Sequence, residues 1–130
     1  MDNPEHLANL AFVEWLEWQK IKFTHIMQET FTTSWKQKNI IKQLVRKGFP
    51  DFIVIIAPEQ SFNGKGLLIA VEMKKPASVL KNGKYSNAKN GASVEQLEWI
   101  ESLNLIGNIQ AKVCQGSNAA IEFVDRFLVH

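Results

Sequence analysis

The chain of 130 residues is long enough for one hydrophobic core, and we treat residues 1–130 as a single domain. Hydrophobic residues make up 45% of the sequence and charged residues 22%, which excludes an intrinsically disordered chain. The formal net charge of +2 is too small to indicate a partner by itself.

Cysteine usage and apolar content exclude further classes. Cys114 is the only cysteine, so neither an internal disulfide nor a cysteine-based zinc site can form within one chain. Its apolar neighbours predict a packed thiol. No apolar segment approaches the ~20 residues of a membrane span, and the amino terminus does not resemble a signal peptide. We therefore expect an intracellular, cytoplasmic protein with no membrane partner.

The first part of the chain predicts two helices and a strand. Residues 4–20 have a broad apolar face at helical spacing. Residues 21–27 alternate between apolar and polar side chains, which is typical of a strand. Residues 37–47 are expected to form a short basic helix that ends at Gly48.

Two apolar runs predict the centre of a sheet. Residues 51–57 and 67–74 have the length and the β-branched content of buried strands. The glycine-containing segment 61–66 lies between them and is typical of a turn, so the two runs form a hairpin-like pair.

The last part of the chain begins with a polar loop over residues 76–92, of a length that is usually functional or disordered. Ser93 and Gln96 form the signature of a capping box for a helix that runs to about residue 103. A strand over residues 109–114 and an amphipathic helix over residues 118–128 follow. The whole order predicts an α/β domain with a central mixed β-sheet flanked by helices.

Charged residues stand at the edges of the two central strands. Asp51 opens the first, and Glu72 and Lys74 close the second. Charged side chains are rarely buried unless they are paired or bind a metal. Two carboxylates suit a hard cation such as Mg²⁺, with which a lysine could assist phosphodiester hydrolysis. The alternative is an exposed Glu72–Lys74 ion pair at a strand end, with Asp51 in a simple turn.

Basic residues flank this acidic pair in two blocks without acids, which favours a nucleic acid as partner. Solvated lysine-rich turns are the alternative for either block alone. The second block also includes Lys74. The candidate DNA-binding residues are Lys36, Lys38, Lys42, Arg46 and Lys47 in the first block, and Lys75, Lys81, Lys84 and Lys89 in the second.

Four tryptophans are many for this length. We expect Trp99 in the core, whereas Trp15 and Trp18 on the first helix suggest a subunit interface.

The motifs together resemble one known family. Gly48-x-Pro50-Asp51, Glu72-x-Lys74 and Ser93-x-x-Gln96-x-x-Trp99 look like the VRR-NUC branch of the PD-(D/E)XK nucleases, and the likeness extends over nearly the whole chain. It implies a restriction-endonuclease-like fold with an α-β-β-β-α-β core and a carboxy-terminal helix. Each motif alone carries little information, whereas their order and combination are specific.

The resemblance also implies the site. Asp51 and Glu72 would bind Mg²⁺ or Mn²⁺, and we add the backbone carbonyl of Met73 as a ligand. Lys74 would assist the nucleophile, and Gln96 matches a glutamine that follows the E-x-K motif on the next helix.

An acid of the first helix usually completes such sites, and Glu5 fits best by position. Glu14 and Glu17 are its rivals on that helix, and Glu29 is a further one beyond the first strand. Asn9 departs from the family, which often carries glutamine there.

His25, on the alternating strand, is either a DNA-contacting or second-sphere residue or a structural histidine. We expect a metal-dependent deoxyribonuclease that resembles Holliday-junction resolvases and acts as a homodimer, encoded by a phage or a bacterium. A flap or nicking nuclease, or a DNA-binding module without catalysis, are the alternatives.

Overall fold

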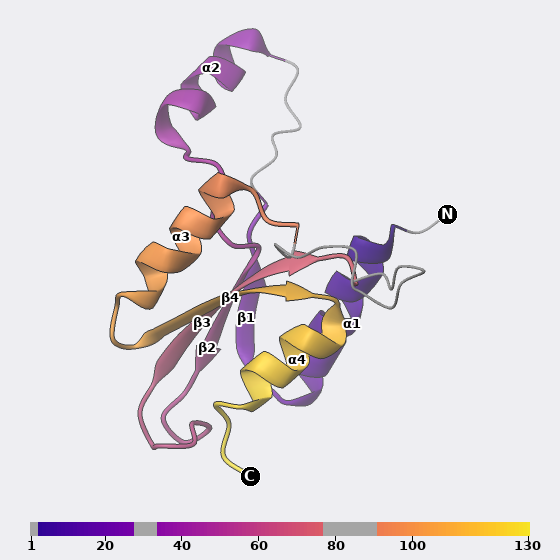
Figure 1. Ribbon diagram of the computed structural model, residues 1–130, viewed down its shortest axis with the longest axis vertical. Helices are drawn as coiled ribbons and strands as arrows, with labels where there is room; N and C mark the ends of the chain where they lie inside the picture. The colour runs from indigo at the N-terminus through magenta and orange to yellow at the C-terminus, as the bar shows by residue number, and fades with distance from the viewer. Residues whose placement is uncertain (1–2, 28–33, 77–90) are drawn as a thin grey trace, which may run out of the picture.

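The computed structural model of the chain describes residues 3–27, 34–76 and 91–130 (Figure 1). The hypotheses on Glu29 and on Lys81, Lys84 and Lys89 therefore lie outside the described residues, as does most of the predicted loop.

The sheet has four strands in the order β1-β2-β3-β4, with bounds that lie within a few residues of those expected. Neighbouring strands pair antiparallel, except that β3 and β4 run parallel, so the sheet is mixed as predicted. The β2–β3 pair is the expected hairpin. The strands are β1 (Lys22–His25), β2 (Phe52–Ile56), β3 (Leu67–Lys74) and β4 (Ile109–Gln115).

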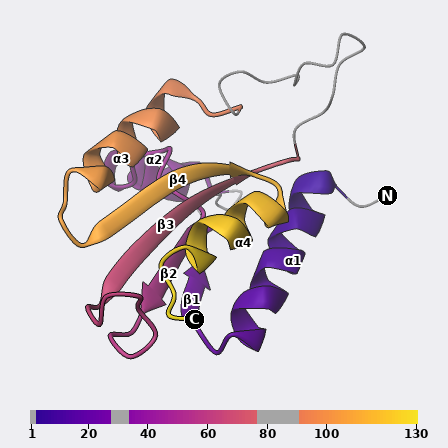
Figure 2. The ribbon, with the colours of Figure 1, turned by 60° about the horizontal axis from the view of Figure 1, so that its bottom comes forward.

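The core lies on one face of this sheet, under α1 (Pro4–Trp18) and α4 (Ser117–Asp125) (Figure 2). Phe12 of α1 meets Phe52 of β2 edge to face, with ring centroids 5.1 Å apart. Every second residue of a strand points to the same face, which explains why the long apolar runs still have one core face and one thinly covered face. Cys114 is buried as predicted, and burial raises the pKa of its thiol to about 12.

The other face carries α3 (Val94–Asn104), which packs near β4 and has no fully buried residue. The prediction that Trp99 belongs to the core is wrong. Trp99 is only partly buried, its Nε1 donates to the carbonyl of Lys47 at 3.1 Å, and its ring stands edge-on to Phe49. A helix that covers a sheet without burying a full stripe leaves its tryptophan partly exposed.

Helix α2 (Trp35–Leu44) stands away from the rest of the molecule (Figure 1). It begins earlier than residue 37 because the Ser34 side chain accepts a hydrogen bond from the Gln37 amide. It ends at Leu44, before residue 47, because the backbone of Val45 is already extended.

The last helix is also shorter than predicted. It ends at Asp125, because the following residues turn back and Leu128 forms an isolated bridge with Ser61. None of the helices in the described ranges combines the length and the apolar character that crossing a membrane requires.

Candidate active site

The site forms where β3 continues beyond β2. The β2–β3 ladder ends at the pair Phe52–Val71, whereas β3 pairs with β4 as far as Lys74. Continuing the antiparallel register by one residue brings Asp51 opposite Glu72. Residues that lie directly opposite each other point to the same face, so the two carboxyl groups are neighbours. Lys74 points to this face as well, because it lies two residues beyond Glu72.

Asp51 is held by both neighbouring strands. Its Oδ2 accepts a hydrogen bond from the Met73 amide at 2.9 Å, and its main-chain carbonyl accepts one from Ile26 at 2.6 Å. The side chain of Asp51 thus replaces a main-chain partner for β3 where β2 has ended. This arrangement leaves little freedom to the Asp51 carboxyl group.

The backbone of β3 also directs a carbonyl to this place. The Lys74 carbonyl accepts from Gly116 on the β4 side, and the Leu68 amide donates to Asn108 on the same side. Because N–H and C=O of one strand residue point to the same edge, the alternation directs the Met73 carbonyl to the Asp51 edge.

A cavity of about 420 Å³ opens over these residues and draws side chains from several elements. It brings together most of the predicted site residues. Its lining consists of Glu5, Asn9, His25, Ile26, Met27, Phe49, Asp51, Glu72, Lys74 and Gln96. Asn9, at the position where the family often carries glutamine, also belongs to this lining. Its spacing of one helical turn from Glu5, which puts both on one face of α1, is the signal that could have found it.

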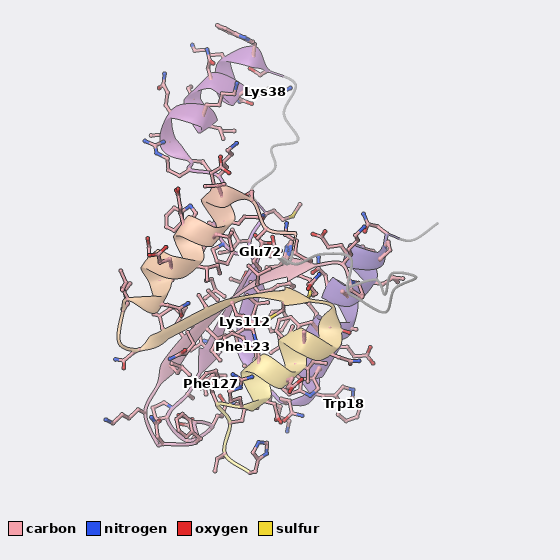
Figure 3. The ribbon with its side chains drawn as sticks, in the orientation of Figure 1. Trp18, Lys38, Glu72, Lys112, Phe123 and Phe127 are labelled. Atoms are coloured by element: carbon pink, nitrogen blue, oxygen red, sulfur yellow. The ribbon has the colours of Figure 1, made fainter. Side chains whose placement is uncertain are left out.

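Glu72 is buried, with 2% of its surface exposed, at the end of β3 (Figure 3). Burial raises its pKa to about 9, and its hydrogen bond with Asp51 and the negative charge of Asp51 act in the same direction. Lys74 lowers the pKa and Glu5 raises it further, so both lie within electrostatic reach. An exposed Glu72–Lys74 ion pair, the alternative considered above, is therefore wrong.

Gln96 lies at the start of α3, where the predicted capping box is present. Its Oε1 accepts a hydrogen bond from the Ser93 amide at 2.9 Å, and its own amide donates to Ser93 Oγ at 3.1 Å. The capping bond occupies the side-chain oxygen. The side-chain nitrogen of Gln96, Nε2, is a donor and is the group that remains for the cavity.

Gly48 joins the loop before β2 to the start of α3. Its φ of +98° is in the left-handed region, and a Cβ at this position would lie 2.8 Å from the backbone carbon of Glu95 and 3.0 Å from the amide nitrogen of Gln96. Only glycine fits without displacing one of the two segments. This contact gives a structural reason for the glycine of the Gly48-x-Pro50-Asp51 motif.

The other predicted residues lie around the site or away from it. Glu14 and Glu17 are exposed and line a separate hollow near Trp18, which is 79% exposed, so neither rival of Glu5 reaches the cavity. His25 is exposed at the cavity and meets Phe52 with ring centroids 4.7 Å apart, so it has both a structural contact and access to a ligand. Trp15 packs partly buried against the core.

The basic residues of the first block belong mostly to α2. Lys36, Lys38 and Lys42 are exposed on this helix, and Figure 3 shows Lys38 far from the core. Lys47 pairs with Glu95 at 3.3 Å, and Arg46 donates to the Gln43 carbonyl at 2.9 Å. Lys75 is exposed just beyond β3.

Within the described ranges, no three His, Cys, Asp or Glu side chains are already gathered as ligands of a metal ion. The donors around Asp51 nevertheless fit Mg²⁺, which is usually bound by one or two carboxylates and keeps several waters. Two adjacent carboxyl groups, of which one is buried and the other is fixed by the Met73 amide, match that requirement.

In fold, this chain is similar to a VRR_NUC domain protein. The two structures superpose with a TM-score of 0.62 over 98% of this chain and 89% of the other, at 20% sequence identity. No protein-family model and no curated protein matches the sequence. The resemblance inferred from the motifs is thus confirmed at the level of the fold, as is the predicted restriction-endonuclease-like α/β class.

Proposed function

We propose that this chain is a VRR-NUC nuclease that hydrolyses DNA phosphodiester bonds with a divalent cation. One observation carries the proposal. Residues that are far apart in the sequence, Glu5, Asp51, Glu72, Lys74 and Gln96, line one cavity, and they are the catalytic residues that the family resemblance implies. The shared fold with a VRR_NUC domain protein supports the same reading.

In the proposed mechanism, Asp51, Glu72 and the Met73 carbonyl would hold Mg²⁺ or Mn²⁺. Glu72 would have to be ionised for this, because a carboxyl group binds a metal in its ionised form. Bound there, the cation would lower the pKa of a water and stabilise negative charge on a phosphate oxygen.

The remaining residues then orient the reaction. Lys74 lies on the same face as Glu72 and is placed to orient the attacking water or to balance charge on the phosphate. Gln96 offers its amide nitrogen to an oxygen in the cavity, and Glu5 adds a further acceptor from α1. None of these roles requires a covalent intermediate.

The finer proposal is that the substrate is branched DNA, such as a four-way junction, and that the enzyme is a homodimer. A junction offers two symmetric strands, which a two-fold dimer would meet with two matched sites. The exposed lysines of α2 and Lys75 would contact phosphates beyond the cavity and position the DNA without reading its sequence.

The decisive experiment compares cleavage of junction, flap and linear duplex DNA with Mg²⁺, with Mn²⁺ and with a chelator. Asp51→Asn and Glu72→Gln should each lower the cleavage rate at least ~100-fold, since both remove a charge that holds the cation. Asp51→Asn is preferable to alanine, because an oxygen remains to accept from the Met73 amide. Glu14→Gln, an exposed change on the same helix as Glu5, is the matched control and should cleave normally.

Each outcome separates the alternatives. Preference for flaps or for nicked duplex would replace the junction assignment, and a molar mass of one chain in light scattering would exclude the dimer. Salt-sensitive DNA binding that ignores the chelator, with no cleavage by any form, would identify a DNA-binding module instead. Full cleavage by both site variants would refute the proposed active site.

A further inference from the structure

Asn9 has a shielded side-chain oxygen without a hydrogen-bond partner. Its Oδ1 has less than 1 Å² of accessible surface and meets no donor among the described residues; no other buried side-chain atom there is left in this state. Asn9 lies one helical turn after Glu5 and lines the same cavity as Asp51 and Glu72.

A buried carbonyl oxygen without a donor is unfavourable, because it has lost its hydrogen bonds to water and gained none. Such atoms are rare in native proteins and indicate that a partner is missing. Helix α1 cannot easily rotate about its axis to move Asn9 out of the cavity. Ala8 beside it is buried, and Phe12, one turn after Ala8, packs against Phe52.

The chemistry of the cavity limits what that partner is. Lys74 and the Gln96 side-chain nitrogen are donors that line the cavity, but neither forms a hydrogen bond with Asn9 Oδ1, and neither does Glu72. Once Asp51 and Glu72 are ionised, as cation binding requires, they only accept hydrogen bonds, as do the phosphate oxygens of DNA. A divalent cation, or a water that it binds, meets the need directly, because hard cations favour oxygen ligands and their waters are donors.

We propose that Asn9 is a further residue of the cation site, whose Oδ1 binds the hydrated cation together with the Asp51–Glu72 pair. The proposal rests on the proposed function in that it assumes a cation there. It assigns this chain's Asn9 a role that neither the E-x-K motif nor the carboxylates supply.

The proposal predicts effects of opposite sign on stability and on cation binding. Asn9→Leu has a similar volume and removes the unpaired oxygen. In a chelator, its melting temperature should equal or exceed that of the wild type, because no hydrogen bond is lost. Its dissociation constant for Mn²⁺ alone should rise about tenfold, the equivalent of one hydrogen bond. The stabilisation by saturating Mn²⁺ should shrink accordingly.

Asn104 provides a matched control. Its side chain accepts from the Ala111 amide at 2.8 Å and donates to the Ala111 carbonyl at 2.9 Å, so its polar atoms are satisfied. Asn104→Leu should lower the melting temperature in chelator and leave Mn²⁺ affinity unchanged. Asn9→Asp keeps an oxygen at the critical position and should bind Mn²⁺ at least as tightly as the wild type does.

Calorimetric titration of the full chain with MnCl₂ and thermal unfolding with and without chelator measure both quantities. A stability loss for Asn9→Leu like that of Asn104→Leu, with unchanged Mn²⁺ affinity, would overturn the role of Asn9. If Glu72→Gln abolishes Mn²⁺ binding while Asn9→Leu does not weaken it, the proposed function stands and this inference alone fails. If the wild type binds no Mn²⁺, the proposed function fails first.

Discussion

The buried carboxyl group of Glu72 links the stability of the metal-free protein to pH. Its pKa is raised from 4.5 to about 9 in the folded chain, mainly by burial. Between these values the folded state holds a proton that the unfolded chain has released, so stability falls as pH rises. The contribution of Glu72 is fully present below about pH 4.5 and is lost as pH rises through about 9.

Glu72→Gln, which resembles the protonated form, should remove this dependence. In chelator, the melting temperature of the wild type should fall more steeply than that of the variant between about pH 5 and pH 9. At the alkaline end the variant should be the more stable protein, although its cleavage activity is expected to be lost. Thermal unfolding over this pH range checks the prediction, with Glu14→Gln as the exposed control. Parallel profiles for wild type and Glu72→Gln would contradict it.

The same proton also competes with the cation. Because Glu72 must ionise to bind Mn²⁺, affinity should strengthen as pH rises toward about 9, and binding should release protons. Titrations in buffers of different ionisation enthalpy measure that release.

At the level of elements, the contact between Gly48 and α3 couples two motifs that are remote in sequence. The loop that carries Pro50 and Asp51 can lie against the start of α3 only because Gly48 has no side chain. Gln96, at the start of α3, therefore keeps its place relative to Asp51 through this contact.

Gly48→Ala should disturb both stability and cleavage. At position 48, an added side chain would meet both a left-handed φ and the Glu95 backbone. At Gly64, with φ +73° and nothing within 4 Å, it would meet the unfavourable φ alone. We expect Gly48→Ala to lower the free energy of unfolding by at least ~1 kcal/mol more than Gly64→Ala does. It should also slow cleavage, while Gly64→Ala leaves cleavage intact. Denaturant titration and cleavage rates test both points, and equal effects of the two variants would show that the contact is unimportant.

On the scale of the whole molecule, positive charge is concentrated on α2, which projects from the end of the sheet where the cavity lies (Figure 1). Within the helix there is no acidic residue. Trp35 and Leu44 are 77% and 76% exposed, so the helix also offers apolar surface. Under the proposed function, α2 would follow a DNA backbone beyond the reacting phosphate.

Replacing Lys36, Lys38 and Lys42 together by glutamine should weaken DNA binding and reduce its salt dependence by up to ~3 in the log–log slope. The cleavage rate of bound DNA should change little, because none of these lysines lines the cavity. The matched control replaces Lys20, Lys22 and Lys65, which are exposed at the opposite end of the sheet. Binding titrations at several salt concentrations compare them. Equal losses in the two triple variants would mean that only net charge matters.

The sequence predicted the parts of this architecture that depend on local pattern. The two central strands followed from their apolar runs, and the start of α3 followed from Ser93 and Gln96. Asp51 and Glu72 were paired correctly because a hairpin register is set by its turn and its two faces. The predicted closing helix is too long because the Leu128–Ser61 bridge, which draws the chain out of the helix, is a tertiary contact.

Two features of the site required the tertiary structure. The unpaired oxygen of Asn9 becomes evident only when α1 is packed beside the sheet. The requirement for glycine at position 48 becomes evident only when the start of α3 lies against the loop that contains it. The core position predicted for Trp99 is wrong because periodicity does not show how completely a helix covers a sheet.

The burial of Cys114 has a practical consequence for studying this protein. It is the only cysteine of the chain, and its thiol is inaccessible and holds its proton at neutral pH. A Gln43→Cys change on the exposed surface of α2 would then be the single position that a maleimide dye can reach. Fluorescence from a dye at that position would report on α2 when DNA is added, without a contribution from a second labelled cysteine.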